Sequence, residues 1–298
     1  MKEKAYLFGN NLLGILSEPE NSESDYPCVL LLNSGMIHKI GPNRLYVKLA
    51  RTLVKSGYKV FRFDFSGVGD SPIAIENEGD FETSARKNTQ EAMDFLNSLQ
   101  GMDRFILFGI CSGADISFQT GAFDKRVSGI ITINGYLVEN ASKNYSDSDI
   151  SRSITLRYYK KNMFNLTRWK KVITGQSNLF SRDNFTNFYK FFLKKLKLPG
   201  LRFKKNENIR KGDNNVLKPW NQMIENNTRI LQIYSEGSDA FEVFRKTLKN
   251  KLGNFVNNNT VELMTIPDVD HVFTPVWAQE YLINEVTNRM NNWFNGKN

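Results

Sequence analysis

Two patterns of apolar and polar residues alternate along the chain. Short continuous apolar runs that end in Gly, Ser, Asn or Asp are typical of strands buried on both faces of a sheet. Such runs occur at residues 28–35, 59–71, 104–111, 127–135, 229–239 and 261–271. Most are followed by segments whose apolar residues recur every three or four positions, as in amphipathic helices. These segments cover residues 44–56, 82–99, 113 onward, 240–252 and 276–294.

This alternation predicts an α/β fold with a mostly parallel central sheet and helices on both of its faces. Residues 5–19 differ, because they contain two short stretches of alternating polarity separated by Gly and Asn. That arrangement predicts an antiparallel hairpin. Ligands of parallel sheets bind at the carboxyl ends of the strands, so polar residues that directly follow the predicted strands are the first candidates for chemistry.

Residues 138–228 interrupt the alternation. Two stretches in this segment, 157–175 and 184–198, are rich in Lys, Arg and aromatic residues at helical spacing. They predict basic amphipathic helices. We therefore expect a core formed by residues 1–137 and 229–298, with a basic helical cap inserted at 138–228. The same helices taken alone are also typical of a module that lies on a membrane surface.

The charge of the chain is concentrated in this insertion. The 298 residues carry a net charge of +9, and residues 141–218 hold 19 Lys and Arg against 5 Asp and Glu. A positive field of this kind favours an anionic partner. No nucleic-acid recognition motif accompanies the basic residues, so we expect no binding to nucleic acid.

The sequence also indicates the cellular compartment of the protein. Its longest apolar runs are far shorter than the roughly 20 residues that a membrane span needs, and the N-terminal segment lacks the features of a signal peptide. We expect a cytoplasmic protein without a transmembrane segment, and the basic helices leave peripheral membrane contact open. The 2 cysteines, Cys28 and Cys111, do not form a disulfide framework in a chain of this length, so reduced thiols are expected.

The stretch LFGICSGAD at 107–115 places two nucleophile candidates, Cys111 and Ser112, where a strand turns sharply into a helix. Such a turn leaves almost no room for a side chain two residues before or after the nucleophile. With Cys111 at the apex these positions are Gly109 and Gly113, whereas Ser112 at the apex would place a β-branched isoleucine in one of them. Cys111 is therefore the predicted nucleophile, and its position at a helix N-terminus favours the thiolate. The alternative is an inert buried thiol.

The partners of a nucleophile on this type of turn follow in the chain order acid, then histidine. Asp239 and His271 each follow a predicted strand in that order, and His271 is one of only 2 histidines. We predict that His271 is the general base and that Asp239 orients its imidazole. Asp270, beside His271, and Glu236, near Asp239, are rival acids. Asp239 is ranked first because residues adjacent in sequence rarely reach the imidazole well.

Backbone N–H groups would stabilise the negative oxygen of the transition state. One is that of Ser112, and a second comes from Gly35 or Met36, in the loop after the strand at 28–35. Three further residues are candidates for the substrate pocket. They are His38, Arg44 and Trp169. His38 and Arg44 also have a simpler interpretation, since a loop histidine or an arginine at a helix start is often only solvated.

Several stretches together resemble the α/β-hydrolase superfamily, and within it the exosortase-system-associated hydrolases, which are relatives of the serine-aminopeptidase-like group. The first is IGPNRLYVKLARTLVKSGYKVFRFDFSGVGDS at 40–71, the second FGICSGA at 108–114, and the third YYKKNMFNLTRWKKVITG at 158–175. The likeness covers most of the chain. Ser112 replaces an acidic residue of that group, Trp169 follows Arg rather than Phe, and the cap is longer and more basic.

The resemblance implies an α/β-hydrolase fold with a helical cap and an enzyme that needs neither metal nor cofactor. It also implies action on esters, thioesters or amides. Together with the candidates Cys111, His271 and Asp239, the resemblance predicts a thioesterase or carboxylesterase with a Cys-His-Asp triad and a covalent acyl-enzyme. The substrate would be a small acyl compound, carried on CoA or on a carrier protein. Two alternatives remain: acyl transfer by the same triad, or a hydrolase-like module that binds an anionic partner through its cap without turnover.

Overall fold

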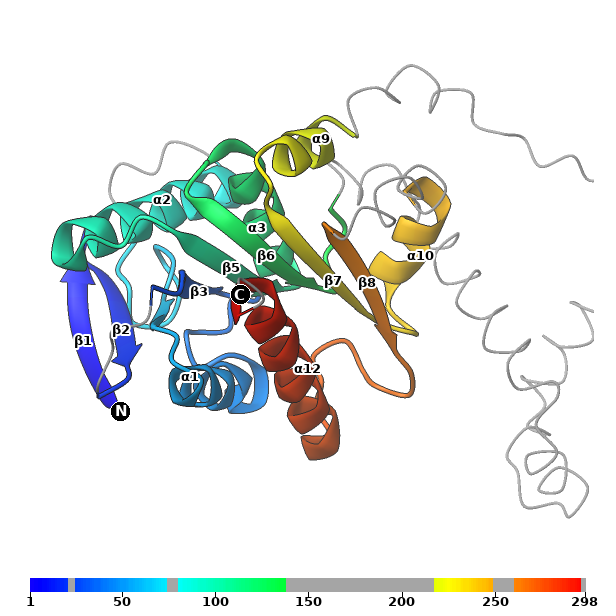
Figure 1. Cartoon of the computed structure of the whole chain (residues 1–298), viewed down its shortest axis with the longest axis horizontal. Helices are drawn as coiled ribbons and strands as arrows, with labels where there is room; N and C mark the ends of the chain where they lie inside the picture. The colour runs from blue at the N-terminus through cyan, green and yellow to red at the C-terminus, as the bar shows by residue number, and fades with distance from the viewer. Residues whose placement is uncertain (21–24, 74–79, 138–216, 249–259, 296–298) are drawn as a thin grey trace, which may run out of the picture. The chain divides into compact units, whose positions relative to one another are not determined.

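The computed structural model describes residues 1–20, 25–73, 80–137, 217–248 and 260–295. The strands in these ranges form one sheet of eight, in the order β1-β2-β4-β3-β5-β6-β7-β8 (Figure 1). They are β1 (Lys2–Phe8), β2 (Leu12–Glu18), β3 (Cys28–Leu32), β4 (Val60–Phe63), β5 (Phe105–Ile110), β6 (Val127–Ile133), β7 (Arg229–Ser235) and β8 (Val261–Ile266). Strands β3 to β8 are parallel to one another, and β2 pairs antiparallel with both β1 and β4.

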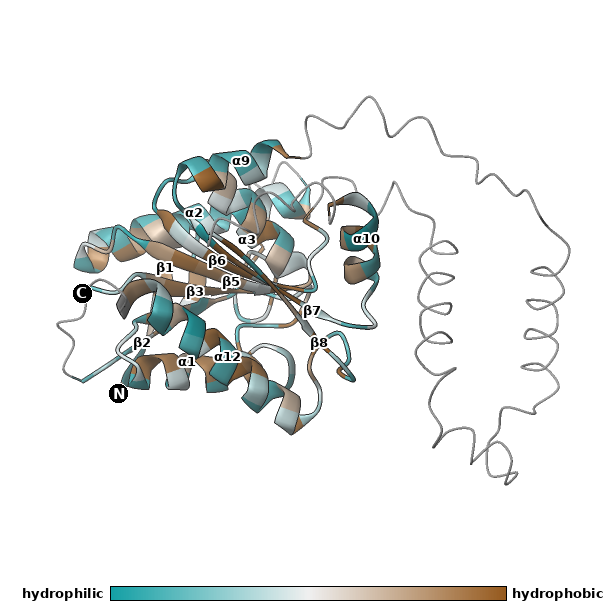
Figure 2. Ribbon diagram, turned by 45° about the vertical axis from the view of Figure 1, so that its right-hand side comes forward, coloured by the Kyte–Doolittle hydropathy of each residue, from teal (hydrophilic) through white to brown (hydrophobic). Residues whose placement is uncertain are grey.

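Helices cover both faces of this sheet (Figure 2). They are η1 (Pro42–Arg44), α1 (Leu45–Lys55), α2 (Phe81–Gln100), α3 (Ser112–Phe123), α9 (Lys218–Glu225), α10 (Asp239–Thr247) and α12 (Val276–Asn295). α1 and α12 pack on one face, where they share a hydrophobic cluster with the strands, while α2, α3, α9 and α10 share a second cluster on the other face. The predicted α/β class, with a mostly parallel sheet between two helical layers, is confirmed.

Local sequence explains where these elements begin and end. The strand β3 is a run of five buried residues, as expected for a strand covered on both faces. The helix α2 begins after Asp80, whose side chain accepts a hydrogen bond from the Thr83 N–H, and ends at Gly101 in the left-handed conformation. The same glycine could not be replaced by a β-branched residue without strain.

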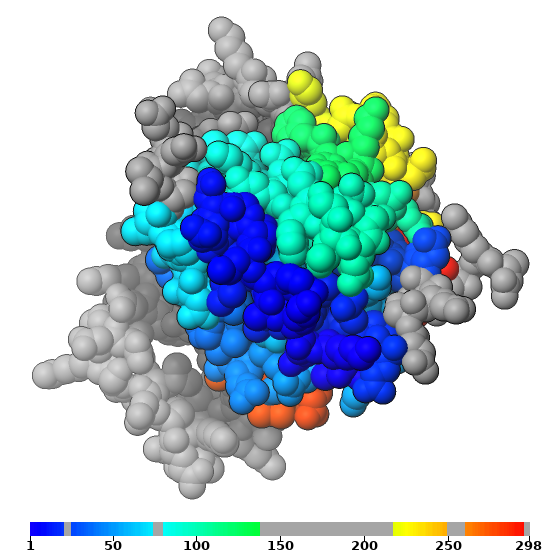
Figure 3. Space-filling view, turned by 90° about the vertical axis from the view of Figure 1, so that its left-hand side faces the viewer, coloured from blue at the N-terminus to red at the C-terminus, as the bar shows by residue number. Residues whose placement is uncertain are grey.

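The predicted hairpin is the antiparallel pair β1–β2 at one edge of the sheet. Figure 3 shows its surface in dark blue beside the cyan and green surface of α2 and the elements that follow it. The rings of Tyr6 and Phe8 lie 5.5 and 5.3 Å from the ring of Phe95 in α2. These aromatic contacts attach the edge strand to the helical layer.

Part of the segment assigned to the cap packs on the core. In α9, Trp220 is fully buried and its ring lies 4.8 Å from that of Phe118 in α3. Residues 138–216, with both predicted basic helices, lie outside the described ranges, so the division into core and cap stays a prediction. None of the helices that the structure describes is long and apolar enough to cross a membrane.

Candidate active site

Cys111 occupies a strained bend between β5 and α3. Its backbone has φ 57° and ψ −123°, a conformation that a residue with a side chain rarely adopts. The bend is held by a hydrogen bond of 2.9 Å from the Cys111 N–H to the carbonyl of Ile133, at the end of the neighbouring strand β6. Strain of this kind persists where the surrounding structure enforces it, and it is concentrated at functional sites.

The two glycines that flank Cys111 have no room for a side chain. A Cβ atom at Gly109 would lie 2.1 Å from the backbone of Gly113, and a Cβ at Gly113 would lie 2.5 Å from the carbonyl oxygen of Asn33. Both contacts involve backbone atoms, which cannot move aside as a side chain can. Cys111, rather than Ser112, therefore stands at the apex of the bend, for the steric reason that the sequence suggested.

Ser112, the first residue of α3, connects this helix to the loop after β3. Its hydroxyl oxygen accepts a hydrogen bond of 2.8 Å from the backbone N–H of Gly35, in the loop after β3. The Gly35 N–H is therefore already paired. Of the two donors predicted in this loop, the Met36 N–H has no hydrogen-bond partner among the described residues. Met36 is also 73% exposed, at the outer end of the loop.

The thiol of Cys111 is half-buried, and its pKa is raised above the ordinary value. Burial is the main cause, the Ser112 N–H lowers the pKa in part, and the nearby Asp115 carboxylate raises it. The expectation of a thiolate favoured by the helix N-terminus is therefore not met in the free protein. A proton acceptor is needed to ionise this sulfur.

A buried ionic network fixes the loop after β3. The carboxylate of Asp64 is fully buried and accepts hydrogen bonds from the Asn33 amide at 3.1 Å and from the Lys39 N–H at 2.5 Å. The Lys39 ammonium group lies 2.7 Å from the same carboxylate and also pairs with Asp70. Burial lowers the pKa of Lys39, but hydrogen bonds to the two carboxylates raise it overall. Asp64 thus has a structural role, because it holds Asn33 and Lys39 of this loop in place.

His271 lies in the loop between β8 and α12, and its backbone carbonyl accepts a hydrogen bond of 2.8 Å from the side-chain amide of Asn134. The residue is exposed, yet desolvation of the imidazole lowers its pKa. The carboxylate of Asp239 opposes this shift, and that of Asp270 opposes it to a smaller extent. The imidazole is thus neutral near pH 7 and able to accept a proton.

The two acids near His271 differ in what they bind. Asp239 is exposed at the first position of α10, after β7. The carboxylate of Asp270 accepts hydrogen bonds from the Thr274 N–H at 2.7 Å and from the Thr274 hydroxyl at 2.6 Å, so it is used within its own loop. The backbone N–H of Glu236 donates to the Ile266 carbonyl. Asp239 thus has the larger electrostatic effect on His271, and Asp270 is bound within its own loop. The choice of Asp239 as the orienting acid stays a prediction.

The remaining pocket candidates are less well placed. His38 is half-buried near Asp70. The pKa of Asp70 is lowered mainly by Lys39 and only slightly by His38. Arg44 is exposed just before α1 and has a left-handed backbone with φ 60°. Trp169 lies outside the described residues. His38 thus lies near the ionic network of the loop, and the structure gives no role to Arg44.

Two residues near this edge of the sheet were not identified from the sequence. Asn134 follows β6 directly, and its amide binds the His271 loop. Asp115, one turn after Cys111 in α3, accepts a hydrogen bond of 2.8 Å from the Leu137 N–H, and burial raises its pKa to about 7. The Asn-Gly pair after a predicted strand marks Asn134 as a turn residue but does not reveal its bond to His271, and nothing local marks Asp115.

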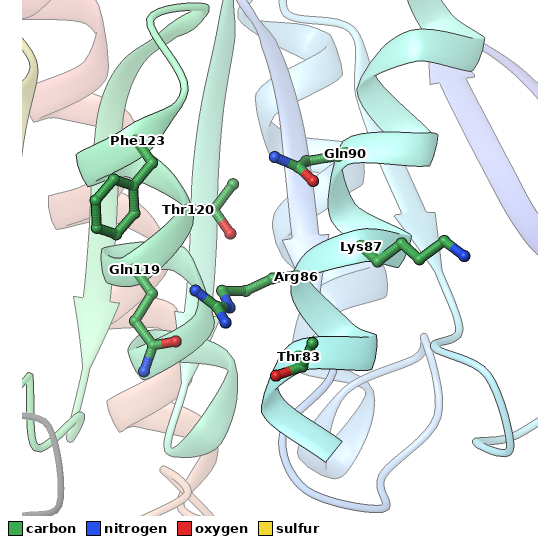
Figure 4. A pocket seen from close by; sticks show the side chains of 7 residues that line it. All are labelled: Thr83, Arg86, Lys87, Gln90, Gln119, Thr120 and Phe123. Atoms are coloured by element: carbon green, nitrogen blue, oxygen red, sulfur yellow. The ribbon is translucent and has the colours of Figure 1, made fainter. Parts of the chain in front are cut away.

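A separate hollow of about 260 Å³ lies between α2 and α3 (Figure 4). It is lined by Thr83, Arg86, Lys87, Gln90, Gln119, Thr120 and Phe123. None of the predicted site residues lines it, and its α3 residues come from the half of the helix that is distant from Cys111. Within the described ranges, no group of three or more His, Cys, Asp or Glu side chains is arranged to hold a metal ion.

Three comparisons place this arrangement among known proteins. The model of the alpha/beta hydrolase fold family matches residues 29–232. No curated protein matches the chain. Several solved structures match the chain at low sequence identity. A hypothetical protein of Pseudomonas aeruginosa, PA2218, is 17% identical with a TM-score of 0.57, and the match covers 98% of this chain and 93% of that one.

Two further structures are similar. The esterase PF2001 of Pyrococcus furiosus is 15% identical with a TM-score of 0.56, over 98% of this chain and 90% of its own. A proline iminopeptidase of Mycobacterium smegmatis is 13% identical with a TM-score of 0.55, over 98% of both chains. At such identities the likeness shows the fold alone, and the narrower resemblance to exosortase-associated hydrolases stays a prediction. The family model, however, spans more than half of the 298 residues. The chain therefore belongs to the alpha/beta hydrolase family, and its enzyme class is hydrolase.

Proposed function

We propose that this hydrolase cleaves ester or thioester bonds without a cofactor and uses Cys111 as its nucleophile. The observation that carries the proposal is the backbone of Cys111, held at φ 57° and ψ −123° between two glycines that tolerate no side chain. A bend of this kind presents the side chain at its apex to a substrate at the carboxyl edge of the sheet. No other reason for the strain is evident in the described contacts of Cys111.

In the first half of the reaction, His271 takes the proton of the Cys111 thiol while the sulfur attacks the acyl carbon. The raised pKa of the thiol explains why a base is required, and the lowered pKa of the imidazole keeps that base neutral. Protonated His271 then gives its proton to the leaving oxygen or sulfur as that bond breaks. The products are a free alcohol or thiol and an acyl group bound to Cys111 as a thioester.

In the second half, water attacks the acyl carbon and gives a proton to His271. The carbon–sulfur bond breaks, the acid product leaves, and the sulfur recovers its proton from His271. The carboxylate of Asp239 stabilises the imidazolium in both halves. The N–H groups of Ser112 and Met36 would bind the negative oxygen of each intermediate, with about 3 kcal/mol of transition-state stabilisation per donor.

The charge of the chain suggests how the acyl group is delivered. The 19 Lys and Arg at residues 141–218 favour an acyl group carried on an anion, such as CoA, phosphopantetheine or an acidic carrier protein. The name of one similar structure, an esterase, agrees with this bond class. Two free thiols, Cys28 and Cys111, agree with a cytoplasmic location. Acyl transfer to an amine or alcohol in place of water is a variant of the same chemistry.

One observation favours a second candidate. The raised pKa of Cys111 is also the property of an inert thiol, in a hydrolase-like module that binds an anionic partner without turnover. The two candidates differ in what His271 does. Under the proposed function, the imidazole makes the thiol reactive near neutral pH, whereas in a binding module the thiol would be unreactive with or without the histidine.

Hydrolysis of p-nitrophenyl acetate and of acetyl-CoA by the wild type and by Cys111→Ala tests the proposal. We expect the variant to lose at least about 1000-fold in kcat/KM. Cys28→Ala is the matched control, because Cys28 is buried and has a pKa raised to about 12, so its loss removes a thiol that cannot react. Full activity of Cys111→Ala would reject Cys111 as the nucleophile.

A further inference from the structure

Asn134 connects the two loops that carry the predicted acid and base. Its side-chain oxygen accepts hydrogen bonds from the Ser235 N–H at 2.8 Å and from the Ser235 hydroxyl at 3.2 Å, at the end of β7. Its side-chain nitrogen donates to the carbonyl of His271 at 2.8 Å. The residue is 1% exposed. One buried amide thus spans from the strand that precedes Asp239 to the residue that would act as base.

The backbone of Asn134 is equally constrained. It has φ 51°, in the left-handed region that asparagine tolerates better than most residues, and its N–H donates to the Ile233 carbonyl at 2.9 Å. Glycine would adopt this backbone more easily but would supply no amide. Asparagine is therefore the residue type that fits both the backbone and the hydrogen bonds at this position.

The same residue is linked to the nucleophile. Ile133, directly before Asn134, accepts the hydrogen bond of the Cys111 N–H at 2.9 Å. From Cys111 the path to His271 therefore crosses two hydrogen bonds and one peptide unit. One bond joins two backbone groups, and the other joins the short, buried Asn134 side chain to a backbone carbonyl, so the path has little freedom to lengthen or rotate.

We infer that Asn134 is a positioning residue, which holds His271 at the distance from Cys111 that proton transfer requires. The inference rests on the proposed function of Cys111 and His271. Pairing of β6 with β7 is already complete along Gly129 to Ile133, so the amide donor is not needed for the sheet. It serves the histidine loop, and small displacements of a catalytic base are costly because proton transfer depends steeply on geometry.

Two variants separate the loss of the amide donor from changes in backbone strain and in side-chain volume. Asn134→Gly removes the amide and relieves the left-handed backbone, so its loss of activity cannot come from backbone strain. Asn134→Asp keeps the shape and both bonds from Ser235 but replaces the donor with an oxygen that faces the His271 carbonyl. We expect each to lower kcat by about 10- to 100-fold with KM within about twofold. In Asn134→Asp the new carboxylate also raises the pKa of His271, which moves the acidic limb of the pH–rate profile to higher pH.

Ser235→Ala is the control. It removes the bond of 3.2 Å from the hydroxyl and leaves the bond from the Ser235 N–H in place, so kcat should stay within about threefold of wild type. Circular dichroism and thermal unfolding confirm that each variant is folded. If Asn134→Gly does not fold, Asn134→Asp supplies the same test, since it retains the volume of the side chain.

The decisive readout is a double-mutant cycle on the rate of Cys111 alkylation by iodoacetamide. If Asn134 acts through His271, Asn134→Gly slows alkylation about tenfold in the wild type and has no further effect in His271→Ala. Equal effects in both backgrounds, or none in either, would overturn the inference. A wild type whose Cys111 neither alkylates nor supports turnover would instead reject the proposed function.

Discussion

The hydroxyl of Ser112 accepts a hydrogen bond of 2.8 Å from the backbone N–H of Gly35. These residues are 77 positions apart, and the bond joins the first turn of α3 to the loop after β3. It sets the distance between the Ser112 N–H and the Met36 N–H, the two donors proposed to bind the negative oxygen of the intermediate. The Ser112 side chain, next to the predicted nucleophile, thus has a structural role in holding α3 to this loop.

Removing this hydroxyl should loosen the loop without removing a donor. In Ser112→Ala the Gly35 N–H loses its partner, and we expect kcat to fall about tenfold, less than the loss of a direct donor would cost. Ser112→Thr keeps the hydroxyl and serves as the control, with activity near that of the wild type. Steady-state kinetics on p-nitrophenyl acetate measure the effect, and equal activity of the alanine and threonine variants would show that the bond is unimportant.

A side chain at Gly109 should be incompatible with the bend. The Cβ of alanine would lie 2.1 Å from backbone atoms of Gly113, so the strand or the helix must move. We expect Gly109→Ala to lower the free energy of unfolding by about 3 kcal/mol or more, measured by urea denaturation. Gly237→Ala is the matched control, because a Cβ at that position would have nothing within 4 Å of it. Similar stability of the two variants would contradict the steric account of the bend.

Activity should fall at acidic pH as His271 becomes protonated. Desolvation lowers the pKa of this imidazole, so the acidic limb of kcat/KM should lie below the ordinary histidine value of about 6.5. Asp239 raises the same pKa, and Asp239→Asn should therefore move the limb to lower pH while it lowers kcat by about 100-fold or more. Asp270→Asn, whose carboxylate contributes less, should move the limb by a smaller amount. A larger shift in Asp270→Asn would make Asp270 the orienting acid.

Asp115 should make stability depend on pH between about 4 and 7. Burial raises the pKa of its carboxyl from 3.8 to about 7, so the folded state holds a proton that the unfolded state releases. This contribution is complete below the unfolded pKa and is lost as pH rises through the folded pKa. Between pH 5 and pH 8 the wild type should lose about 3 kcal/mol that Asp115→Asn does not lose, measured by urea denaturation at both pH values. Parallel pH dependence in the two proteins would show that Asp115 is ionised throughout.

Features with a local cause could be predicted from the sequence. The order of strands and helices follows from the spacing of apolar residues, and the apex position of Cys111 follows from the glycines two residues before and after it. The direction of the pKa shift of Cys111 could not be predicted, because the helix N-terminus is visible in the sequence while burial by distant segments is not. The bond from Asn134 to His271 spans 137 positions and leaves no local pattern, so only the fold reveals it.

Trapping the acyl group would identify the nucleophile. The protein is mixed with p-nitrophenyl acetate, quenched in acid within the first turnover, digested and analysed by mass spectrometry. We expect an acetyl group on the peptide that contains Cys111, assigned to the sulfur by fragmentation, and no acetyl group there in Cys111→Ala. An acetyl group on Ser112, or turnover by Cys111→Ala at the wild-type rate, would contradict the assignment of Cys111 as the nucleophile.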